Sequence, residues 1–461
     1  MRTDVIVIGT GQAGVPLATR LAGRAKSVLL FERSEIGGTC TNYGCTPTKT
    51  MVASARAAHV ARTAGRLGVR TSATTVDLGA IVDRKEAVVR RWREGVERSI
   101  AEAGPTLRLV HGHARFVGPR EVEANGERYQ AETVIINTGA RPAIPPVPGL
   151  DTVPFLDNKR VMELRELPAH LIILGGGYVG CEFGQMFRRF GSDVTIVDRG
   201  PHLLSREDPD TSRALEDVFQ SEGIQLELQA TVESVAAGSR QIAVQLGRRG
   251  GGGKELHGTH LLVATGRRPN TDDLGCRAAG VELDRRGFVE VDDGYATTAH
   301  GVYAVADVTG GPQFTHTAWD DHRLLFERLV GRTAHGRAGR VIPWVVFTDP
   351  QVAGVGSTEH ELRTRGVAYE VATMPFDDIA RAIEVDETAG TMKVMIDPGT
   401  ERVLGCRLVG AETGELVHIF AVLMQAGASV RAIVDAEAAH PTFAEGVQSL
   451  VMRLPRFALR G

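Results

Sequence analysis

The sequence lacks several features that define familiar classes of protein. It has no excess of one charge, because 53 Lys and Arg stand against 56 Asp and Glu and leave a net charge of −3. That balance gives no electrostatic reason to expect nucleic acid or an anionic membrane as a partner. Cysteine is scarce, with five in 461 residues, which excludes a secreted disulfide scaffold.

Long apolar runs are also missing. No segment approaches 18 uninterrupted apolar residues, so we expect no transmembrane helix. The opening run MRTDVIVIGTGQAG is too short for the apolar region of a signal peptide. A hydrophobic content of 43% nevertheless supplies a sizeable core and excludes wholesale disorder. We therefore expect a soluble, cytoplasmic protein.

Glycine, by contrast, is abundant: 54 of 461 residues, about 12%, against a usual value of about 7%. Two copies of a GxGxxG turn each follow a short apolar run: Gly9-Thr-Gly11-Gln-Ala-Gly14 after residues 4–8, and Gly175-Gly-Gly177-Tyr-Val-Gly180 after residues 171–174. Each copy predicts a buried parallel strand, a glycine turn and a helix. A second apolar run then ends in a carboxylate, Glu32 in the first copy and Asp198 in the second.

This repeated pattern is typical of a dinucleotide-binding turn. Gly9 permits the tight turn, Gly11 lets the backbone approach a pyrophosphate, and Gly14 lets helix and strand pack closely. The helix N-terminus then faces the phosphates, and Glu32 can accept hydrogen bonds from ribose hydroxyls. Two such modules predict two dinucleotides bound by one chain.

The cysteines Cys40 and Cys45 lie in the segment GGTCTNYGCTPTK, shortly after the first carboxylate. They could be zinc ligands, a structural disulfide or a redox pair. Zinc usually requires further Cys or His pairs at short spacing, and none follows, so we predict no resident metal. A structural disulfide is disfavoured in a reducing cytoplasm. Because a flavin in the first module could reach this position, we favour a redox-active disulfide.

The segment GGTCTNYGCTPTK resembles the active-site signature of the FAD-dependent pyridine nucleotide–disulfide oxidoreductases. The resemblance extends over the chain through both glycine turns, two Thr-Gly-x-x-Pro phrases, residues 301–307 and residues 440–445. It implies FAD and NAD(P)H as cofactors. It also implies a glutathione reductase-like α/β fold with two Rossmann-like domains and a C-terminal α+β dimerisation domain. The implied boundaries are 1–148 and 271–338 for FAD binding, 149–270 for NAD(P) binding and 339–461 for dimerisation.

The same resemblance assigns roles around the cysteines. Cys45 would be the thiol nearest the flavin, and Cys40 the interchange thiol that attacks the substrate. Lys49 would lie near the flavin N5 and pair with Glu182 of the second module. A lysine is chemically sensible there, because a cation stabilises the electron-rich reduced flavin.

His440 and Glu445 form a second group of candidate catalytic residues. A histidine before proline at a helix start, with a carboxylate one turn on, suits an oriented imidazole that acts as acid and base. Taken alone, such a pair is more often a surface helix cap. In the resembled family this dyad is supplied by the partner subunit, so the resemblance implies a homodimer.

Further FAD contacts follow from the resemblance. Asp307 would bind the ribityl or pyrophosphate region, and Thr315 and His316 would offer backbone N–H groups to the flavin O2. The family usually has glycine before that aspartate, whereas this chain has Ala306, which we expect to shift the loop slightly. The other implied contacts are Arg33, Gly38, Thr39, Ala114, Thr138 and Gly139.

In the second module, the resemblance makes Tyr178 a gate over the flavin until nicotinamide displaces it; simple packing is the alternative. Asp198 favours NADH, because a carboxylate repels a 2′-phosphate. Arg199 and Arg206 could instead bind that phosphate, so the choice stays open with a slight lean to NADH. The other implied contacts are Gly175, Gly177, Val179 and Gly266.

For the acceptor we expect a small disulfide or a thiol-reactive oxidant such as a metal ion. The ending RLPRFALRG lacks the cysteine pair of mercuric reductases, which disfavours dedicated mercury reduction. The His-Pro-Thr…Glu ending at 440–445 fits dihydrolipoamide dehydrogenases, which stay an alternative, although Thr46-Pro-Thr-Lys49 departs from their Ile-Pro-Ser-Lys. Residues 309–317 and 347–351 look more like bacterial flavoproteins of the mercuric-reductase type, one branch of which is linked to hypochlorite stress and copper(II) reduction.

Two other classes of function remain as alternatives. An NAD(P)H oxidase or diaphorase with a vestigial disulfide would keep its activity in a Cys40→Ser variant. A redox sensor would bind FAD without turnover. We assign no function to a charged helix at 82–103 or to a hairpin tip at 248–254. The same holds for the cysteines Cys181, Cys276 and Cys406.

Overall fold

The computed structural model describes residues 1–239, 241–248, 251–332 and 335–457. The chain divides into two compact units, each assembled from three separate segments. Residues 1–50, 82–143 and 266–339 form the first unit, and residues 51–81, 144–265 and those from 340 onward form the second.

The first unit is built on a sheet with the strand order β3-β2-β1-β6-β5-β4, in which β16 also pairs with β6. Its parallel strands are β1 (Arg2–Ile8), β2 (Val28–Glu32), β3 (Leu107–His111), β6 (Glu127–Ile136) and β16 (Val302–Ala304). Strands β4 (Arg115–Gly118) and β5 (Glu121–Ala124) continue it in antiparallel fashion. The apolar run predicted as a strand at 4–8 is the centre of this sheet, and Ile6 and Val7 are fully buried.

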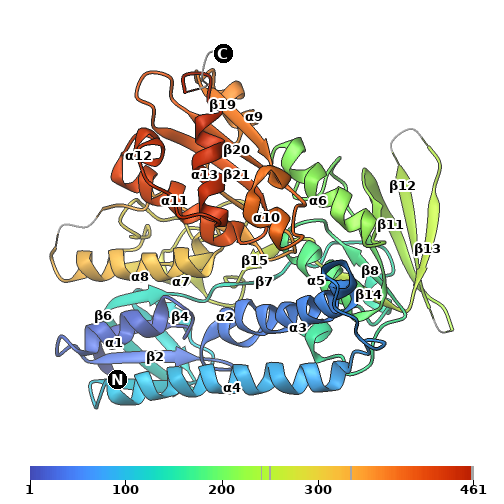
Figure 1. Cartoon of the computed structure of the whole chain (residues 1–461). Helices are drawn as coiled ribbons and strands as arrows, with labels where there is room; N and C mark the ends of the chain where they lie inside the picture. Colours follow the sequence, from blue (N-terminus) through green and yellow to red (C-terminus); the bar gives the residue numbers. More distant parts are fainter. Residues whose placement is uncertain (240, 249–250, 333–334, 458–461) are drawn as a thin grey trace. The chain divides into compact units, whose positions relative to one another are not determined.

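The first glycine turn leads into a helix, and the other helices of the first unit come later in the chain (Figure 1). They are α1 (Gly14–Ala22), α2 (Gly38–Asn42), α7 (Cys276–Ala279), α8 (Thr315–Leu329) and most of α4 (Leu78–Glu102). The charged helix predicted at 82–103 is α4, and its Trp92 side chain is exposed.

The two Thr-Gly-x-x-Pro phrases each follow a parallel strand. The strand before the first phrase is β6, inside its sheet between β1 and β5, and the strand before the second is β14 (His260–Val263), at a sheet edge beside β8 (His170–Leu174). Their second halves, β7 (Ala140–Pro142) and β15 (Arg267–Pro269), pair with each other as an antiparallel ribbon, which the sequence did not predict.

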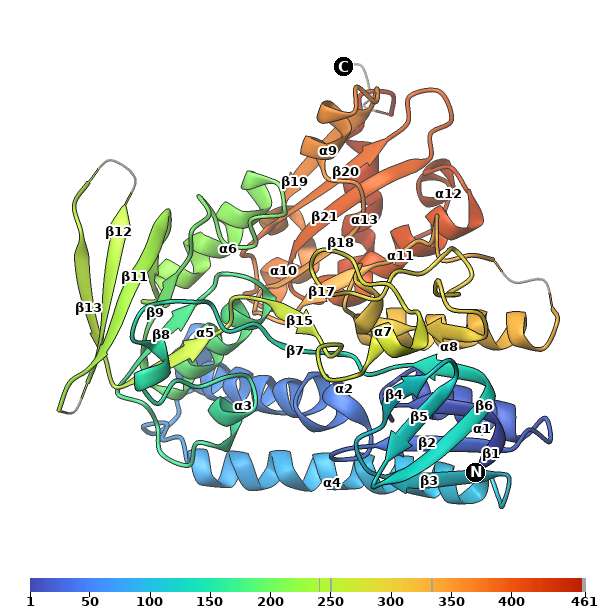
Figure 2. The same ribbon diagram turned by 180° about the vertical axis from the view of Figure 1, so that it is seen from behind.

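The second glycine turn belongs to a parallel sheet with the order β10-β9-β8-β14. Its other strands are β9 (Asp193–Val197) and β10 (Gln225–Glu227), and its helices are α5 (Tyr178–Phe190) and α6 (Pro209–Ser221). An antiparallel meander follows, seen from behind in Figure 2: β11 (Ala230–Ala237), β12 (Ile242–Arg248) and β13 (Lys254–Gly258). The β12–β13 pair is the predicted hairpin, and Arg249 and Gly250 at its tip lie outside the described residues.

The remainder of the second unit carries an antiparallel sheet with the order β17-β18-β21-β20-β19. Its strands are β17 (Trp344–Val346), β18 (Gln351–Gly356), β19 (Glu370–Pro375), β20 (Thr391–Ile396) and β21 (Val403–Gly410). Helices α9 (Glu359–Thr364), α10 (Ala380–Glu384), α11 (Thr413–Ala426), α12 (Arg431–Val434) and α13 (Phe443–Met452) accompany it. Phe376, Phe420 and Leu450 lie in its buried core.

The second unit also includes the C-terminal part of α3 (Cys45–Thr63). Short 3-10 helices complete the described secondary structure at Ala64–Leu67, Leu150–Thr152, Arg160–Glu163, Ala306–Thr309 and Phe376–Asp378. Among the residues that the structure describes, no helix is both long and apolar enough to cross a membrane.

Candidate active site

The first glycine turn is dictated by close backbone contacts. Gly9 has a φ of +108°, and a Cβ there would lie 2.3 Å from the carbonyl oxygen of Asn137. A Cβ at Gly14 would lie 2.0 Å from the Gly9 oxygen, and one at Gly38 would lie 2.7 Å from the Gly11 Cα. The Asn137 amide donates to the Gly9 oxygen at 3.1 Å and braces the turn. Side chains are therefore excluded from the place where the motif predicts a pyrophosphate.

Glu32 and Asp198 fasten the turns of their two modules in the same way. Glu32 accepts a hydrogen bond from the Thr10 N–H at 3.1 Å, and Asp198 accepts from the Gly176 N–H at 2.6 Å. Each carboxylate also accepts from an N–H two residues further on, that of Ser34 or Gly200. Because a carboxylate oxygen can accept two hydrogen bonds, both groups retain capacity for a ribose hydroxyl.

Several polar atoms of the first unit suit a bound polar cofactor. The Arg267 Nε and Thr317 Oγ1 atoms are buried and have no hydrogen-bond partner among the described residues. Burial raises the pKa of Asp307, whose Oδ2 lies 3.6 Å from Arg267 Nη2. Together with the Gly9–Gly14 turn, these groups fit FAD.

Cys40 and Cys45 lie in the two consecutive helices α2 and α3. Cys45 is the first residue of α3, where the positive end of the helix dipole stabilises a thiolate. Its Sγ lies 3.2 Å from Thr315 Oγ1. Cys40 is half-buried in α2, and a hydrogen bond with Cys45, followed by burial, raises the pKa of its thiol. The hydrogen bond with Cys45 and burial thus favour the protonated thiol at Cys40.

Lys49 follows Cys45 by one turn of α3 and is half-buried. Glu182 is buried in α5 and accepts a hydrogen bond from the Phe347 N–H at 2.9 Å. Lys49 belongs to the first unit and Glu182 to the second, and their pairing stays a prediction.

His440 and Glu445 are joined at the start of α13. His440 Nδ1 lies 2.9 Å from Glu445 Oε2, and the Glu445 N–H donates to the capping Thr442 hydroxyl at 3.2 Å. Because Nδ1 is engaged, Nε2 is the nitrogen available for proton exchange. The His440 side chain is 69% exposed in the single chain, so it is accessible to a substrate or to another subunit.

At the second glycine turn, Tyr178 is half-buried as the first residue of α5. Its ring stacks on that of Trp344, with centroids 5.6 Å apart and planes 24° apart. Sequence reasoning missed Trp344, because nothing in its local pattern marks a partner on a distant helix. Val179, Arg199 and Arg206 are exposed around the same turn.

Residues 3–321 match the family described as pyridine nucleotide-disulphide oxidoreductase, and residues 342–451 match its dimerisation domain. The chain belongs to this family.

Similar proteins span different activities. The chain is 35% identical to a dihydrolipoyl dehydrogenase of Thermus scotoductus, over 99% of this chain and 98% of the relative. It is 34% identical to a mercuric reductase of Bacillus cereus, over 97% of this chain and 71% of the relative. A solved structure, the Cu(II) complex of the HOCl-induced flavoprotein disulfide reductase RclA from Escherichia coli, superposes with a TM-score of 0.88 at 34% identity. That comparison covers 97% of this chain and 99% of the other.

Family membership confirms the predicted glutathione reductase-like fold, with two dinucleotide-binding sheets and a C-terminal antiparallel dimerisation domain. It also confirms FAD and NAD(P)H as cofactors and a redox-active disulfide. The protein is a class I flavoprotein disulfide reductase, an NAD(P)H-dependent enzyme.

The residue before Asp307 in this oxidoreductase is an alanine in a conformation that favours glycine. Ala306 keeps a φ of +64°, the left-handed conformation that favours glycine. Its N–H donates to Asp321 Oδ2 at 2.8 Å, while Asp321 Oδ1 accepts from the Tyr295 hydroxyl at 2.9 Å. The buried carboxylate holds the loop in place, so the strain stays in the Ala306 backbone.

Replacing Ala306 by glycine should therefore stabilise the oxidoreductase by about 1 kcal/mol, because glycine adopts this conformation without steric cost. The midpoint of urea unfolding measures the effect. The matched control, Ala87→Gly in the interior of α4, should shift the midpoint in the opposite direction. An Ala306→Gly midpoint at or below that of the wild type contradicts strain at this position.

At the start of α8, Thr315 and His316 occupy the first turn, as expected from the sequence. The His316 ring stacks on Phe314 with centroids 5.3 Å apart. The position of Thr315 beside Cys45 was not predicted, because the two residues are 270 apart in the chain.

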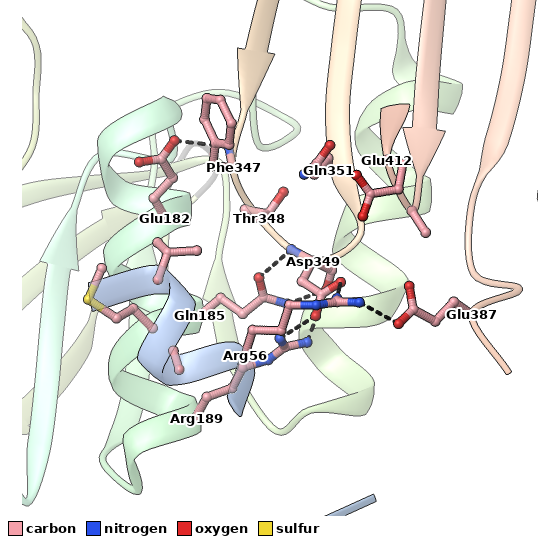
Figure 3. A pocket seen from close by; sticks show the side chains of 14 residues that line it. Arg56, Glu182, Gln185, Arg189, Phe347, Thr348, Asp349, Gln351, Glu387 and Glu412 are labelled. Carbon is pink, nitrogen blue, oxygen red and sulfur yellow. Dashed lines mark hydrogen bonds and ion pairs between the residues drawn. The ribbon is translucent and has the colours of Figure 1, made fainter. Parts of the chain in front are cut away.

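Glu182 of the oxidoreductase also lines a cavity of about 120 Å³, shown in Figure 3. Buried Arg189 pairs there with Asp349 at 2.6 Å and with Glu222 at 2.7 Å, and Arg56 pairs with Asp349 at 2.7 Å. Sequence reasoning missed this network, whose members come from separate segments. It fixes α5, and with it Glu182, against the loop between β17 and β18.

Proposed function

We propose that this enzyme transfers electrons from NAD(P)H, through FAD, to the Cys40–Cys45 disulfide and onward to a small disulfide acceptor. The observation that carries the proposal is the inequality of the two thiols. Cys45 lies at a helix N-terminus that stabilises its thiolate, whereas Cys40 has a thiol pKa raised by its neighbour and by burial. Cys40 therefore needs a base, and the His440–Glu445 pair has the composition of one.

FAD, when bound, supplies the chemistry that accepts a hydride from nicotinamide and passes two electrons to a disulfide. Gly9, Gly11, Gly14 and Glu32 would hold its adenosine diphosphate part. The contacts proposed for the remainder are Arg33, Gly38, Thr39, Ala114, Thr138, Gly139, Asp307, Thr315 and His316. Lys49 would supply the cation, with Glu182 as its partner.

The steps at the cysteines balance as two thiol–disulfide exchanges. Cys40 gives its proton to His440 Nε2 and attacks one sulfur of the acceptor disulfide, which forms a mixed disulfide. His440 returns the proton to the departing thiolate. The Cys45 thiolate then attacks the Cys40 sulfur, releases the second thiolate and restores the Cys40–Cys45 disulfide. Both electrons have then passed to the acceptor.

The second module would bind the nicotinamide nucleotide. Gly175, Gly177, Val179 and Gly266 would contact it, and Tyr178 would be displaced by the nicotinamide. We favour NADH, because the Asp198 carboxylate lies at the end of β9 beside the turn and repels a 2′-phosphate. Arg199 and Arg206 are exposed and would be the residues that bind NADPH.

A homodimer is part of the proposal, in which His440 of each subunit acts on Cys40 of the other. The dimerisation domain carries His440, and that side chain is accessible in the single chain. We propose a cytoplasmic location, where NAD(P)H is supplied, and we propose no nucleic acid or membrane partner. A second acceptor, an oxidising metal ion such as Cu(II), is favoured by the similarity to RclA, whose solved structure is a Cu(II) complex.

An anaerobic titration of the holoenzyme with NADH, and separately with NADPH, tests the proposal. Two electrons should release two titratable thiols while much of the flavin absorbance remains, and a long-wavelength absorbance should appear. Cys45→Ser should keep FAD bound, release no new thiol and lack that absorbance. Direct bleaching of the wild-type flavin without new thiols contradicts the proposal and supports the oxidase or diaphorase alternative.

A further inference from the structure

The Tyr178 ring is the first of four side chains that contact one another in a row. It packs on Trp344, whose other neighbour is the Arg407 guanidinium, 5.6 Å from the indole centroid. Arg407 in turn pairs with the Glu207 carboxylate. Tyr178 and Glu207 belong to the nucleotide-binding part of the second unit, whereas Trp344 and Arg407 belong to the antiparallel sheet. The two parts are therefore in contact twice along this row, through Tyr178 and Trp344 and through Arg407 and Glu207.

Trp344 has little freedom to move among these neighbours. The residue is 8% exposed, and Arg407 beside it is 3% exposed. Arg407 is held by hydrogen bonds to the carbonyl oxygens of Val355 and Gly356, each at 3.2 Å. A Cβ at Gly354 would lie 2.7 Å from Trp344 Cζ2, so only glycine leaves room for the indole. The ring is therefore presented to Tyr178 in one fixed position.

The same short strand contacts α5 a second time. Trp344 begins β17, and the N–H of Phe347, just after that strand, donates to Glu182. Glu182 lies one helical turn after Tyr178. One segment of the dimerisation domain thus holds both residues of α5 that the proposed function uses.

We propose that Trp344 is a positioning residue that holds Tyr178 and thereby sets the affinity for the nicotinamide nucleotide. The inference rests on the proposed function, in which nicotinamide displaces Tyr178. Displacement breaks the Tyr178–Trp344 stack, and offset-stacked rings attract each other beyond their hydrophobic contact. Binding of the nucleotide therefore has to overcome this contact, and weakening the stack strengthens binding.

Trp344→Leu keeps an apolar side chain but removes the stacking partner. We expect the KM for NADH to fall about three- to tenfold, because the free energy of a stacked aromatic pair corresponds to an affinity ratio of about that size. The kcat with a small aromatic disulfide should change less than twofold. Trp344→Phe retains a ring and should return KM toward the wild-type value. Trp92→Leu, which removes an exposed tryptophan of α4, is the matched control and should leave KM unchanged.

A double-mutant cycle separates positioning from a general structural effect. In a Tyr178→Ala background, Trp344→Leu should produce no further change in KM. If Trp344→Leu does not fold, Gly354→Ala displaces the indole without removing it and should lower KM in the same direction. An unchanged KM in Trp344→Leu, or an equal fall with and without Tyr178, overturns the inference. Failure of the proposed function is distinct, because the wild type itself would then release no thiols on anaerobic reduction.

Discussion

Replacing Cys40 by serine should lower turnover of a small disulfide by about 10³-fold or more, because the nucleophile that forms the mixed disulfide is lost. NAD(P)H-dependent reduction of a one-electron acceptor such as ferricyanide should stay within about twofold of the wild type, since the flavin does not need Cys40 for that reaction. Steady-state assays with the two acceptors on the same preparation measure both effects. The expected signature is a large change in the ratio of the two activities.

The control is Cys276→Ala, which removes a buried thiol of α7 that has no proposed role. It should leave both activities near the wild-type level. Disulfide turnover that survives Cys40→Ser contradicts the proposed relay, since the disulfide would then be vestigial. Loss of both activities in Cys40→Ser, with FAD still bound, also contradicts it, because the variant would have disturbed the flavin reaction itself. Cu(II) tested as an acceptor in the same variants shows whether metal reduction uses the same thiol.

Motifs that are local in sequence were predicted well. Gly14 is required by a contact within the turn itself, with the Gly9 oxygen, although the contact that requires Gly9 comes from the distant Asn137. The strand before the turn is a continuous apolar run whose burial is plain from composition. The residues that define a glycine turn at a strand end are close together in the sequence. The same is true of His440 and Glu445, which are five residues apart and meet because a helix begins between them.

Contacts between distant segments could not be predicted in this way. Arg407 and Glu207 are 200 residues apart, and neither has a local pattern that marks the other as its partner. The stack on Tyr178 depends on a tryptophan at the start of an edge strand, where the sequence reads only as apolar. Ala306 shows a different limit, because its left-handed backbone is imposed by the buried Asp321 carboxylate rather than by its own preference. Long-range packing decides these features.

Replacing His440 by alanine should lower kcat/KM for the disulfide acceptor by about 10²- to 10⁴-fold, the usual contribution of a general acid–base group. The half-reaction in which NAD(P)H reduces the enzyme should change less than twofold, because it precedes the exchange at Cys40. Stopped-flow measurement of the two half-reactions separates them. Glu445→Gln should cost less, about tenfold, because an amide can still accept from Nδ1–H but carries no charge to stabilise the imidazolium.

The pH dependence of the His440→Ala variant gives the sharper result. The pKa of the Cys40 thiol is raised by its hydrogen bond with Cys45 and by burial, so at neutral pH the thiol is protonated. Without an internal base, the rate of attack follows the fraction of thiolate and should rise about tenfold per pH unit below that pKa. The wild type, in which His440 removes the proton, should have a shallower profile over the same range. His360→Ala, at an exposed histidine of α9, is the control and should behave as the wild type. Equal slowing of both half-reactions, or a wild-type pH profile in His440→Ala, rules out His440 as the base and leaves the dyad as a helix cap.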